Sequence, residues 1–240
     1  MKLINFKDLI LFENDNYIVI NKPPHIASLD ERTADKKGQS IIRMAKEYWA
    51  DAQLCHRLDK ETSGCLAIAK HPEAYRMLAM QFEDRVVDKV YHAVTNGIHQ
   101  FDGTSVYLPI KALKNGVAVI DRAEGKAAET IFYTLEAYKQ HTLVACKPIT
   151  GRMHQIRVHL QCLKAPIVHD ELYGGKPLFL SQIKRKFNLK KDTDEQPLIS
   201  RVALHAYALC FDDITAQEII IEAPYPKDMM ALLKQLRENK

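Results

Sequence analysis

The sequence predicts an α/β fold, a mixture of helices and strands whose middle is a largely antiparallel sheet. Between residues 105 and 147 the chain carries short runs of strand-forming residues separated by turn signals, Asn115-Gly116 and Glu124-Gly125 among them. On either side of this region, apolar residues recur at spacings of three and four, the period of an amphipathic helix. With 240 residues, of which 47% are hydrophobic, the chain can bury a substantial core. We expect one domain over residues 1–240, with a core from about residue 11 to residue 236.

Local patterns predict the N-terminal elements. Residues 10–12 and 17–20 are short apolar runs on either side of Glu13-Asn14-Asp15-Asn16, a turn-forming cluster, and they predict a β-hairpin. Lys22-Pro23 ends the second strand. A helix is expected from Gln39 onward, and its apolar stripe consists of Ile41, Ile42, Ala45, Tyr48 and Trp49. The single tryptophan is expected to pack in the core, with stacking on a base as the alternative.

A buried strand at residues 65–69 and a helix opened by His71-Pro72-Glu73 come next. Proline fits the first helical turn because its missing donor costs nothing there, and Glu73 suits the positive helix N-terminus. The buried face of this helix is expected to hold Ala74, Met77, Leu78 and Phe82. Residues 89–95 alternate as a strand with Lys89 and Tyr91 on one side. Tyr91 is therefore either a site residue or a half-buried strand aromatic.

A third helix follows Thr150-Gly151, with an apolar stripe of Met153, Ile156, Leu160 and Leu163. Arg157 borders this stripe, where its guanidinium can bind a carboxylate bidentately or extend into water. His154 and His159 are five residues apart rather than the four that place two ligands on one helix face, so no metal site is predicted.

The chain ends with a predicted strand at residues 219–221 and a helix opened by Pro226. Met230, Leu233 and Leu236 are expected on the inward face of this helix.

Charge and cysteine content limit the class of protein. A net charge of +4 permits a basic face for nucleic acid without requiring one. The five cysteines include no C-x-x-C pair and lie mostly in apolar segments, which is typical of reduced core residues. No apolar stretch approaches the ~18 residues of a transmembrane helix, and the N-terminus lacks the apolar region of a secretion signal. We therefore expect a cytoplasmic protein without a membrane span.

The stretch His56-Arg57-Leu58-Asp59-Lys60-Glu61-Thr62-Ser63-Gly64 crowds polar residues against the predicted strand at residues 65–69. Catalytic groups are usually held in loops that a rigid strand braces, so Asp59 is the candidate catalytic residue. The same residue types also fit a solvated turn with a local ion pair. The local sequence leaves both interpretations open.

An ordered set of motifs resembles the RluA-type RNA pseudouridine synthases. The set consists of Lys22-Pro23, His56-Arg57-Leu58-Asp59 with Thr62-Ser63-Gly64, Lys89-Val90-Tyr91-His92-Ala93, residues 150–160 (TGRMHQIRVHL), Asp170-Glu171-Leu172-Tyr173-Gly174 and Leu204-His205-Ala206. The resemblance extends over nearly the whole chain. It implies an α/β catalytic fold, with a largely antiparallel mixed sheet flanked by helices and a central cleft that holds Asp59. It also implies a catalytic domain without the accessory N-terminal RNA-binding domain of some relatives.

The implied reaction breaks the bond between ribose and uracil nitrogen 1 and joins carbon 5 to the same anomeric carbon. An ionised carboxylate suits this isomerisation, because carboxylates add to or stabilise anomeric centres in glycosidases, and neither a redox cofactor nor a metal is required. By the resemblance, Asp59 is that carboxylate and Arg157 is the cation that keeps it ionised. Tyr91 takes the family position that lines the uracil pocket and is implicated in proton removal from carbon 5.

RNA contacts are expected from two places. Arg57 matches the residue that fills the space left by the flipped nucleotide in relatives, and His56 precedes it. Residues 177–197 look like an insertion with an aromatic residue among its basic ones, which are Lys184, Arg185, Lys186, Lys190 and Lys191. A solvated surface segment is the other interpretation of these charges.

The predicted protein is a monomeric isomerase acting on structured RNA, either ribosomal or transfer RNA. Two alternatives stay open on residue types. One is a nucleosidase or glycoside hydrolase that pairs Asp59 with Glu61, and the other is a non-catalytic RNA-binding module.

Overall fold

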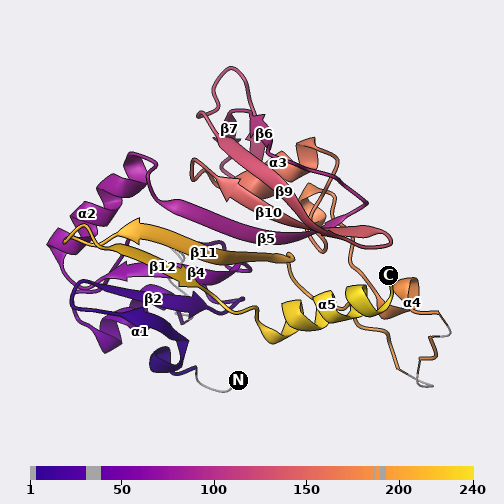
Figure 1. Cartoon of the computed structure of the whole chain (residues 1–240), viewed down its shortest axis with the longest axis horizontal. Coiled ribbons are helices and arrows are strands. Elements are labelled where there is room, and N and C mark those ends of the chain that lie inside the picture. The colour runs from indigo at the N-terminus through magenta and orange to yellow at the C-terminus, as the bar shows by residue number, and fades with distance from the viewer. Residues whose placement is uncertain (1–3, 31–38, 186, 190–192) are drawn as a thin grey trace. The chain divides into compact units, whose positions relative to one another are not determined.

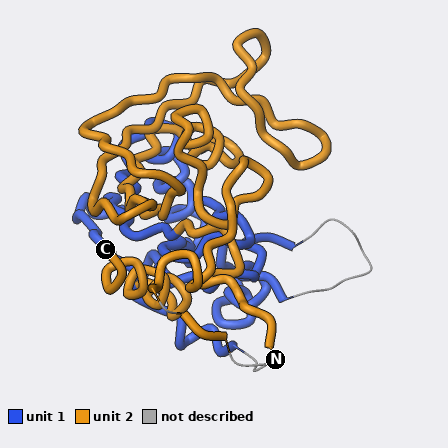
Figure 2. Tube along the Cα trace, turned by 90° about the vertical axis from the view of Figure 1, so that its right-hand side faces the viewer, with its two compact units in different colours: residues 1–90, 205–224 blue, residues 91–204, 225–240 orange. Residues whose placement is uncertain are grey.

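The computed structural model of the protein describes residues 4–30, 39–185, 187–189 and 193–240. These residues form two compact units, each assembled from two separate stretches of chain (Figure 2). The first unit contains residues 1–90 and 205–224, and the second contains residues 91–204 and 225–240. The chain therefore passes between the units three times. The expectation of a single domain over residues 1–240 stays a prediction.

The first unit is built around a mixed sheet with two helices (Figure 1). Its elements are the 3₁₀ helix η1 (Phe6–Leu9), β1 (Ile10–Glu13), β2 (Tyr17–Lys22), α1 (Ile41–Tyr48), β3 (Gln53–Leu54), β4 (Ser63–Ala69), α2 (Pro72–Glu83), the start of β5 (Asp88–Asn96), β11 (Leu204–Asp212) from His205 onward, and β12 (Glu218–Glu222). The strand order is β1-β2-β4-β11, and β12 pairs with β11. β4 and β11 are parallel, whereas the other pairs in this unit are antiparallel.

The predicted N-terminal hairpin is confirmed. β1 and β2 pair with Glu13 opposite Ile18, and the Asn14 side chain accepts hydrogen bonds from the backbone N–H groups of Asn16 and Tyr17 in the turn. An asparagine side chain that satisfies nearby backbone donors is the reason this residue type favours turns. The same turn is fixed to the β11–β12 connection, because the Asn14 and Asn16 amides donate to the Asp213 carboxylate at 2.9 Å each.

Both predicted helices of this unit form, and each has a side-chain cap. Ser40 caps α1 and His71 caps α2, two roles that were not predicted, and Pro72 lies in the first turn of α2 as the sequence predicts. Two core assignments are wrong. Met77 is 38% exposed, and Trp49 is 42% exposed. Trp49 follows the last residue of α1 in an extended conformation, so its indole leaves the helix face and donates to the carbonyl of Lys70 at 2.7 Å.

The second unit contains an antiparallel sheet with the strand order β5-β10-β9-β6, and a separate two-stranded sheet (Figure 1). Its elements beyond β5 are β6 (Thr104–Tyr107), β7 (Ile110–Ala112), β8 (Ala118–Ile120), β9 (Glu129–Ala137), β10 (His141–Pro148), α3 (Gln155–Cys162), η2 (Glu171–Tyr173), α4 (Leu180–Ile183) and α5 (Lys227–Glu238). The antiparallel middle of the chain is thus confirmed. β7 was not predicted, because three residues with one lysine carry too short a pattern. Within the described ranges, no helix combines the length and apolarity that crossing a bilayer requires.

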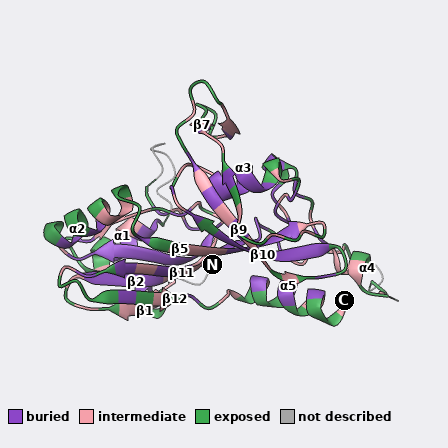
Figure 3. Cartoon of the chain, turned by 45° about the horizontal axis from the view of Figure 1, so that its top comes forward, coloured by how far each residue is buried: buried purple, intermediate pink, exposed green. Residues whose placement is uncertain are grey.

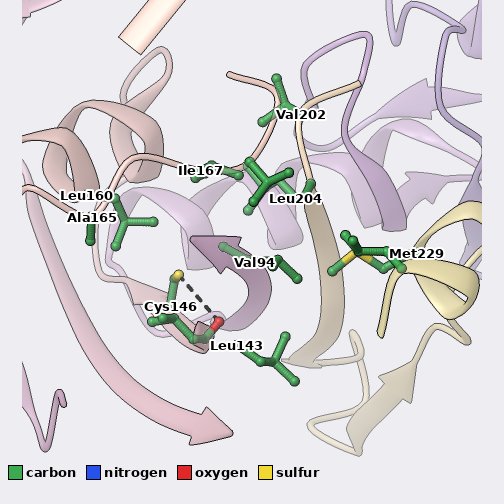
Figure 4. Packing of buried hydrophobic residues seen from close by; sticks show 14 of the residues in the cluster. Val94, Leu143, Cys146, Leu160, Ala165, Ile167, Val202, Leu204 and Met229 are labelled. Atoms are coloured by element: carbon green, nitrogen blue, oxygen red, sulfur yellow. Dashed lines mark hydrogen bonds between the residues drawn. The ribbon is translucent and has the colours of Figure 1, made fainter. Parts of the chain in front are cut away.

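The core of the second unit lies between its sheet and α3 and α5. Figure 4 shows side chains from β5, β10, α3, β11 and α5 packed against one another, with Val94, Leu204 and Met229 among them. On α5 the inward residues are Met229, Leu232, Leu233 and Leu236, whereas Met230 is 51% exposed. The prediction of Met230 as a core residue is therefore wrong by one position. The apolar stripe of the helix includes both Met229 and Leu232, which together set its rotation.

A buried arginine fixes the start of α5. Arg201 has no exposed surface, and its Nε and Nη2 donate to the two carboxylate oxygens of Asp228 at 2.7 and 3.1 Å. Its Nη1 donates to the carbonyls of Val202 and Leu204 at 3.1 Å. The pair joins the first turn of α5 to the residues that lead into β11, and Asp228 also suits the positive N-terminus of the helix.

The expected insertion at residues 177–197 contains only the short helix α4 among its described residues. Lys184 and Arg185 are exposed, and Lys186, Lys190 and Lys191 lie outside the described residues.

Every residue of β4 is buried, and Figure 3 shows buried residues in the neighbouring strand β2 as well. One glycine in β4 leaves no room for a side chain. Gly64 has a φ of +114°, and a Cβ atom there would lie 2.1 Å from the carbonyl oxygen of Ala206 on the neighbouring parallel strand. We expect Gly64→Ala to lower the free energy of unfolding by roughly 2–5 kcal/mol, the sum of left-handed strain and overpacking. Urea denaturation followed by circular dichroism measures the change.

Gly116→Ala is the matched control, because Gly116 also has a positive φ, +80°, but a Cβ atom added there would meet no other atom within 4 Å. The free energy of unfolding of the control should fall only by the amount that a positive φ costs a residue with a side chain. Equal losses of stability in the two variants would show that the close approach of β11 is unimportant.

Candidate active site

The loop that carries Asp59 is fixed by backbone hydrogen bonds on both sides of the carboxylate. The Ser28 hydroxyl accepts from the N–H of Leu58 at 3.1 Å and donates to the carbonyl of the same residue at 2.8 Å. The carbonyl of Asp59 accepts from the N–H of Thr62 at 3.1 Å, which closes a turn. The Leu58 side chain is 6% exposed, so it anchors the loop in the core. These contacts restrict the backbone on which the Asp59 side chain depends.

A buried lysine ties the segment that follows β2 to this loop. Lys22 is the last residue of β2 and has no exposed surface. Its ammonium group donates to the carbonyls of Pro23, Ile26 and Lys60 at 2.9, 2.9 and 3.2 Å. A buried cation requires such polar partners, because desolvation otherwise disfavours its charge. Lys22 therefore holds the segment after β2 against the residue that follows Asp59.

His56 supports the same loop from its other end. Its Nε2 accepts a hydrogen bond from the N–H of Ala67 on β4 at 3.0 Å, and its ring packs against Phe82 with 4.9 Å between centroids. Burial, together with the nearby Lys89 charge, lowers the pKa of His56 to about 3. The imidazole is therefore neutral at physiological pH, and its described contacts anchor the loop to β4. The expected RNA contact of His56 stays a prediction.

The strand that follows the loop is locked by a second histidine. His205, fully buried on β11, has its Nε2 3.0 Å from the carbonyl of Ala223 and its Nδ1 2.9 Å from the hydroxyl of Ser63. Because a carbonyl only accepts, Nε2 carries the proton and Nδ1 accepts from Ser63. This pair sets the start of β4 beside β11, where Ser63 lies opposite His205.

The exposure of the loop side chains suits contact with a substrate. Arg57 and Lys60 are exposed, whereas Asp59 and Glu61 are partly buried. Asp59 thus lies on a fixed backbone at the surface of the first unit, with cationic side chains at positions 57 and 60.

In the second unit, Arg157 forms a bidentate ion pair with Asp170. Its Nε and Nη2 donate to the two carboxylate oxygens at 2.7 and 2.8 Å. Arg157 is 9% exposed and Asp170 is 1% exposed, so both charges are largely removed from water. Asp59, the partner expected from the resemblance, belongs to the first unit, and its pairing with Arg157 stays a prediction. The pair with Asp170 uses two of the five donors of the guanidinium group.

Tyr173 supports this ion pair through its ring. The guanidinium carbon of Arg157 lies 4.9 Å from the centroid of the Tyr173 ring, a cation–π arrangement. The Tyr173 hydroxyl bonds both the N–H and the carbonyl of Ala118, at 2.9 and 3.1 Å, and lies 2.8 Å from Nδ1 of His154. The motifs at residues 150–160 and 170–174, separate in sequence, therefore form one cluster of contacts.

Buried polar residues fix α3, the helix that carries Arg157. Gln155, 4% exposed, accepts from the Thr150 hydroxyl and from the N–H of Arg152, and its amide donates to the carbonyl of Glu129 and to Thr130. His159 has no exposed surface, and its two ring nitrogens bond the Thr130 hydroxyl and the carbonyl of Leu108. These bonds attach α3 to β9 and determine where the Arg157 side chain begins.

The other predicted residues divide between the units. Tyr91 lies on β5 opposite Cys146 of β10, is partly buried and packs against the core of the second unit. Asp59, Arg57 and His56 belong to the first unit, whereas Tyr91, Arg157, Lys184 and Arg185 belong to the second. Among the side chains that the structure describes, no three histidine, cysteine, aspartate or glutamate residues gather as a metal site would require.

Sequence reasoning missed the roles of Lys22, Ser28 and Asp170. Lys22 and Asp170 stand in motifs quoted for the resemblance, so their positions were noticed but their partners were not. Ser28 has no signal in the sequence, since a serine in a polar segment is ordinary. Each of the three has a bond to a residue 13 to 38 positions away, beyond any local pattern.

Comparisons with known proteins agree on one family. A family model described as RNA pseudouridylate synthase matches residues 16–162. The chain is 34% identical over 247 residues to the ribosomal large subunit pseudouridine synthase C of Escherichia coli strain K12, covering 98% of this chain and 72% of that protein. The protein of the same name from Vibrio vulnificus strain CMCP6 is 34% identical over 242 residues, covering 100% and 72%.

A solved structure of a related protein supports the same family. The human protein RNA Pseudouridylate Synthase Domain Containing 4 superposes with a TM-score of 0.74 at 26% identity, covering 97% of this chain and 95% of that one. The predicted fold class, α/β with a largely antiparallel mixed sheet and flanking helices, is confirmed. The chain belongs to the RNA pseudouridylate synthase family, the isomerases that convert uridine in RNA to pseudouridine.

Proposed function

We propose that this protein isomerises one or more uridines of large-subunit ribosomal RNA and that Asp59 is its reactive carboxylate. The substrate follows from the names of relatives that are 34% identical over 98% or more of the chain. The observation that carries the assignment of Asp59 is its loop, in which Ser28, Lys22 and His56 restrain the backbone around a carboxylate at the surface. Catalytic groups need such restraint, because small displacements lose much of the rate.

The chemistry requires an anionic group near the ribose. The bond between the anomeric carbon and nitrogen 1 breaks, the same carbon bonds carbon 5, the proton leaves carbon 5, and nitrogen 1 ends protonated. Asp59 acts while ionised, either by adding to the substrate or by stabilising the electron-deficient ribose. Glu61 is not needed, since no water is added and no bond is hydrolysed.

Arg157 is the proposed cation beside Asp59. Its pair with Asp170 fixes the plane of the guanidinium through two bonds, so its other donors have a defined direction. Tyr91, on β5, is proposed to line the uracil pocket and to help remove the proton from carbon 5. Its phenol requires assistance for this, because the reference pKa of tyrosine is about 10.

RNA binding is proposed for cationic side chains of both units. Arg57 is proposed to fill the stack left by a flipped uridine. The exposed Lys184 and Arg185 are proposed to contact phosphates together with Lys186, Lys190 and Lys191, and His56 to lie at the edge of the bound RNA. We propose that the enzyme acts in the cytoplasm and as a monomer.

Asp59→Asn should abolish isomerisation, because the amide keeps the shape of the carboxylate and removes its charge. We expect the single-turnover rate to fall by roughly three orders of magnitude or more, as for other catalytic nucleophiles. Tritium release from carbon 5 of labelled ribosomal RNA fragments measures the rate. Glu61→Gln is the neighbouring control and should retain activity. A rate for Asp59→Asn within about tenfold of wild type, or a larger loss in Glu61→Gln, would refute the assignment.

Variants of the Arg157–Asp170 ion pair distinguish a role of Arg157 in stability from a role in catalysis. Arg157→Met leaves a buried carboxylate without its cation, so it should lose about 3–5 kcal/mol of stability and roughly a hundredfold in single-turnover rate. The double variant Arg157→Met/Asp170→Asn removes both charges and should recover much of the stability but little of the rate.

Thermal unfolding and single-turnover assays are measured on both variants, together with RNA affinity by filter binding. Recovery of the rate in the double variant would make Arg157 a structural residue only. Weakened RNA binding at an unchanged rate would make it an RNA-binding residue.

Arg57→Ala tests how the target uridine leaves its stack. Its loss should slow reaction on a structured stem-loop at least about tenfold more than on a short single strand, because only the stem-loop must be unstacked and unpaired. Lys60→Ala, which also removes an exposed cation from the loop, is the control and should slow both RNAs alike. An equal effect of Arg57→Ala on both RNAs in single-turnover assays excludes the wedge role.

A further inference from the structure

The first unit has a groove between two strand edges that the catalytic residues do not use. Its volume is about 370 Å³, and it is lined by Phe12, Asn14, Gln217, Glu218, Ile219, Ile220 and Ile221. Five of these residues are consecutive and belong to β12 or the position before it. Successive side chains of a strand point to opposite faces, so a groove that touches five in a row follows the edge of the strand. The backbone of β12 is therefore accessible along it.

Both strands beside the groove end their sheet. In the part of the chain that the structure describes, β1 pairs only with β2, and β12 pairs only with β11. The Ile221 carbonyl at one end of β12 accepts from the Cys65 thiol at 3.5 Å. An edge strand offers its remaining N–H and C=O groups to another extended chain, and peptides bind many proteins in this way.

The side chains of the groove favour an occupant with alternating character. Ile219 is 6% exposed and Ile221 and Phe12 are partly buried, so they give the groove an apolar floor. Ile220 points to the other face and is 63% exposed. Side chains of a strand alternate between its two faces. An added strand with apolar residues at every second position would therefore cover either the apolar floor of the groove or the exposed Ile220.

Glu218 lines the groove, and the two segments that contain its lining residues are acidic. Residues 10–16 and 207–222 contain six carboxylates, Glu13, Asp15, Asp212, Asp213, Glu218 and Glu222, and no lysine, arginine or histidine. Lys70 neutralises Glu13 through an ion pair of 3.0 Å. Asp213 and Glu222 accept from amide and hydroxyl groups, which leave their negative charge in place. This region is negative although the whole chain has a net charge of +4.

We propose that the groove between β1 and β12 binds an extended, lysine- or arginine-bearing segment of a partner protein as an added strand. Carboxylates repel the phosphates of RNA, so the substrate is not the occupant. If β12 paired with β12 of a second molecule of this protein, Glu218 and Glu222 of one copy would face those of the other, and like charges on paired strands are unfavourable. This proposal goes beyond the proposed isomerase function and does not depend on it.

The test uses the full chain and a fluorescein-labelled peptide of alternating lysine and valine, about eight residues long, which matches an ordinary strand. The control peptide has glutamate in place of each lysine. Fluorescence anisotropy should give at least about tenfold tighter binding of the basic peptide, with an affinity that falls as salt rises. Equal affinities for the two peptides would overturn the proposal.

Charge variants of Glu218 and Glu83 show where on the protein the peptide binds. Glu218→Lys should weaken binding of the basic peptide at least about fivefold, whereas Glu83→Lys, an exposed charge reversal at the end of α2, should leave it unchanged. Glu218→Gln, a milder change, should weaken it to a smaller extent and serves if the charge reversal impairs folding. Pseudouridine formation should be the same in all these variants.

Hydrogen exchange gives the second readout. The basic peptide should slow exchange of the Ile220 amide, because an added strand bonds the free edge of β12. The N–H groups of Ile219 and Ile221 point toward β11 in this register, so they serve as the internal comparison. Protection only in other segments, or equal effects of the Glu218 and Glu83 variants on affinity, would show that the peptide binds elsewhere. A dimer held through β12, seen by sedimentation and abolished by Ile220→Lys, would assign the groove to a second copy instead.

Discussion

The first unit depends on the contact between two strands that are distant in sequence, β4 and β11, at Gly64 and Ala206. Their parallel pairing requires a backbone approach that excludes any Cβ atom at position 64. The loop with Asp59 leads directly into this point, and the Ser63–His205–Ala223 hydrogen bonds lie beside it. The position of the candidate carboxylate is thus set by how closely the C-terminal part of the chain can pack against β4.

Two different kinds of polar contact hold the candidate residues. Around Asp59 the restraints are mainly bonds to backbone groups, from the Ser28 hydroxyl, the neutral His56 ring and the Lys22 ammonium. Around Arg157 the restraint is a charge pair with Asp170, supported by an aromatic ring. Backbone bonds restrain the loop of Asp59, whereas a bidentate pair fixes the plane of an arginine. Each type of contact suits the residue that it positions.

The distribution of charge distinguishes two surfaces of the first unit. Cationic side chains at positions 57 and 60 flank Asp59, while Glu218 lines the β1–β12 groove and the segments that border it are acidic. A modest net charge therefore conceals an acidic surface that RNA avoids. An RNA-modifying enzyme with such a surface can hold a polyanion at one place and a basic polypeptide at another.

Sequence by itself determined the main helices and strands, the hairpin, the proline in the first turn of α2, the antiparallel middle of the chain and the family with its signature aspartate. These follow from turn chemistry, periodicity and ordered motifs, which act over a few residues. Only the tertiary structure decided that Trp49 and Met230 are exposed, that Lys22 and Ser28 restrain the Asp59 loop, that His56 is neutral and that Arg157 pairs with Asp170. Periodicity gives the apolar stripe of a helix but not its exact rotation, and a buried polar side chain finds its partner across the fold. Desolvation and the close approach of distant backbones are properties of the packed chain, and no local pattern encodes them.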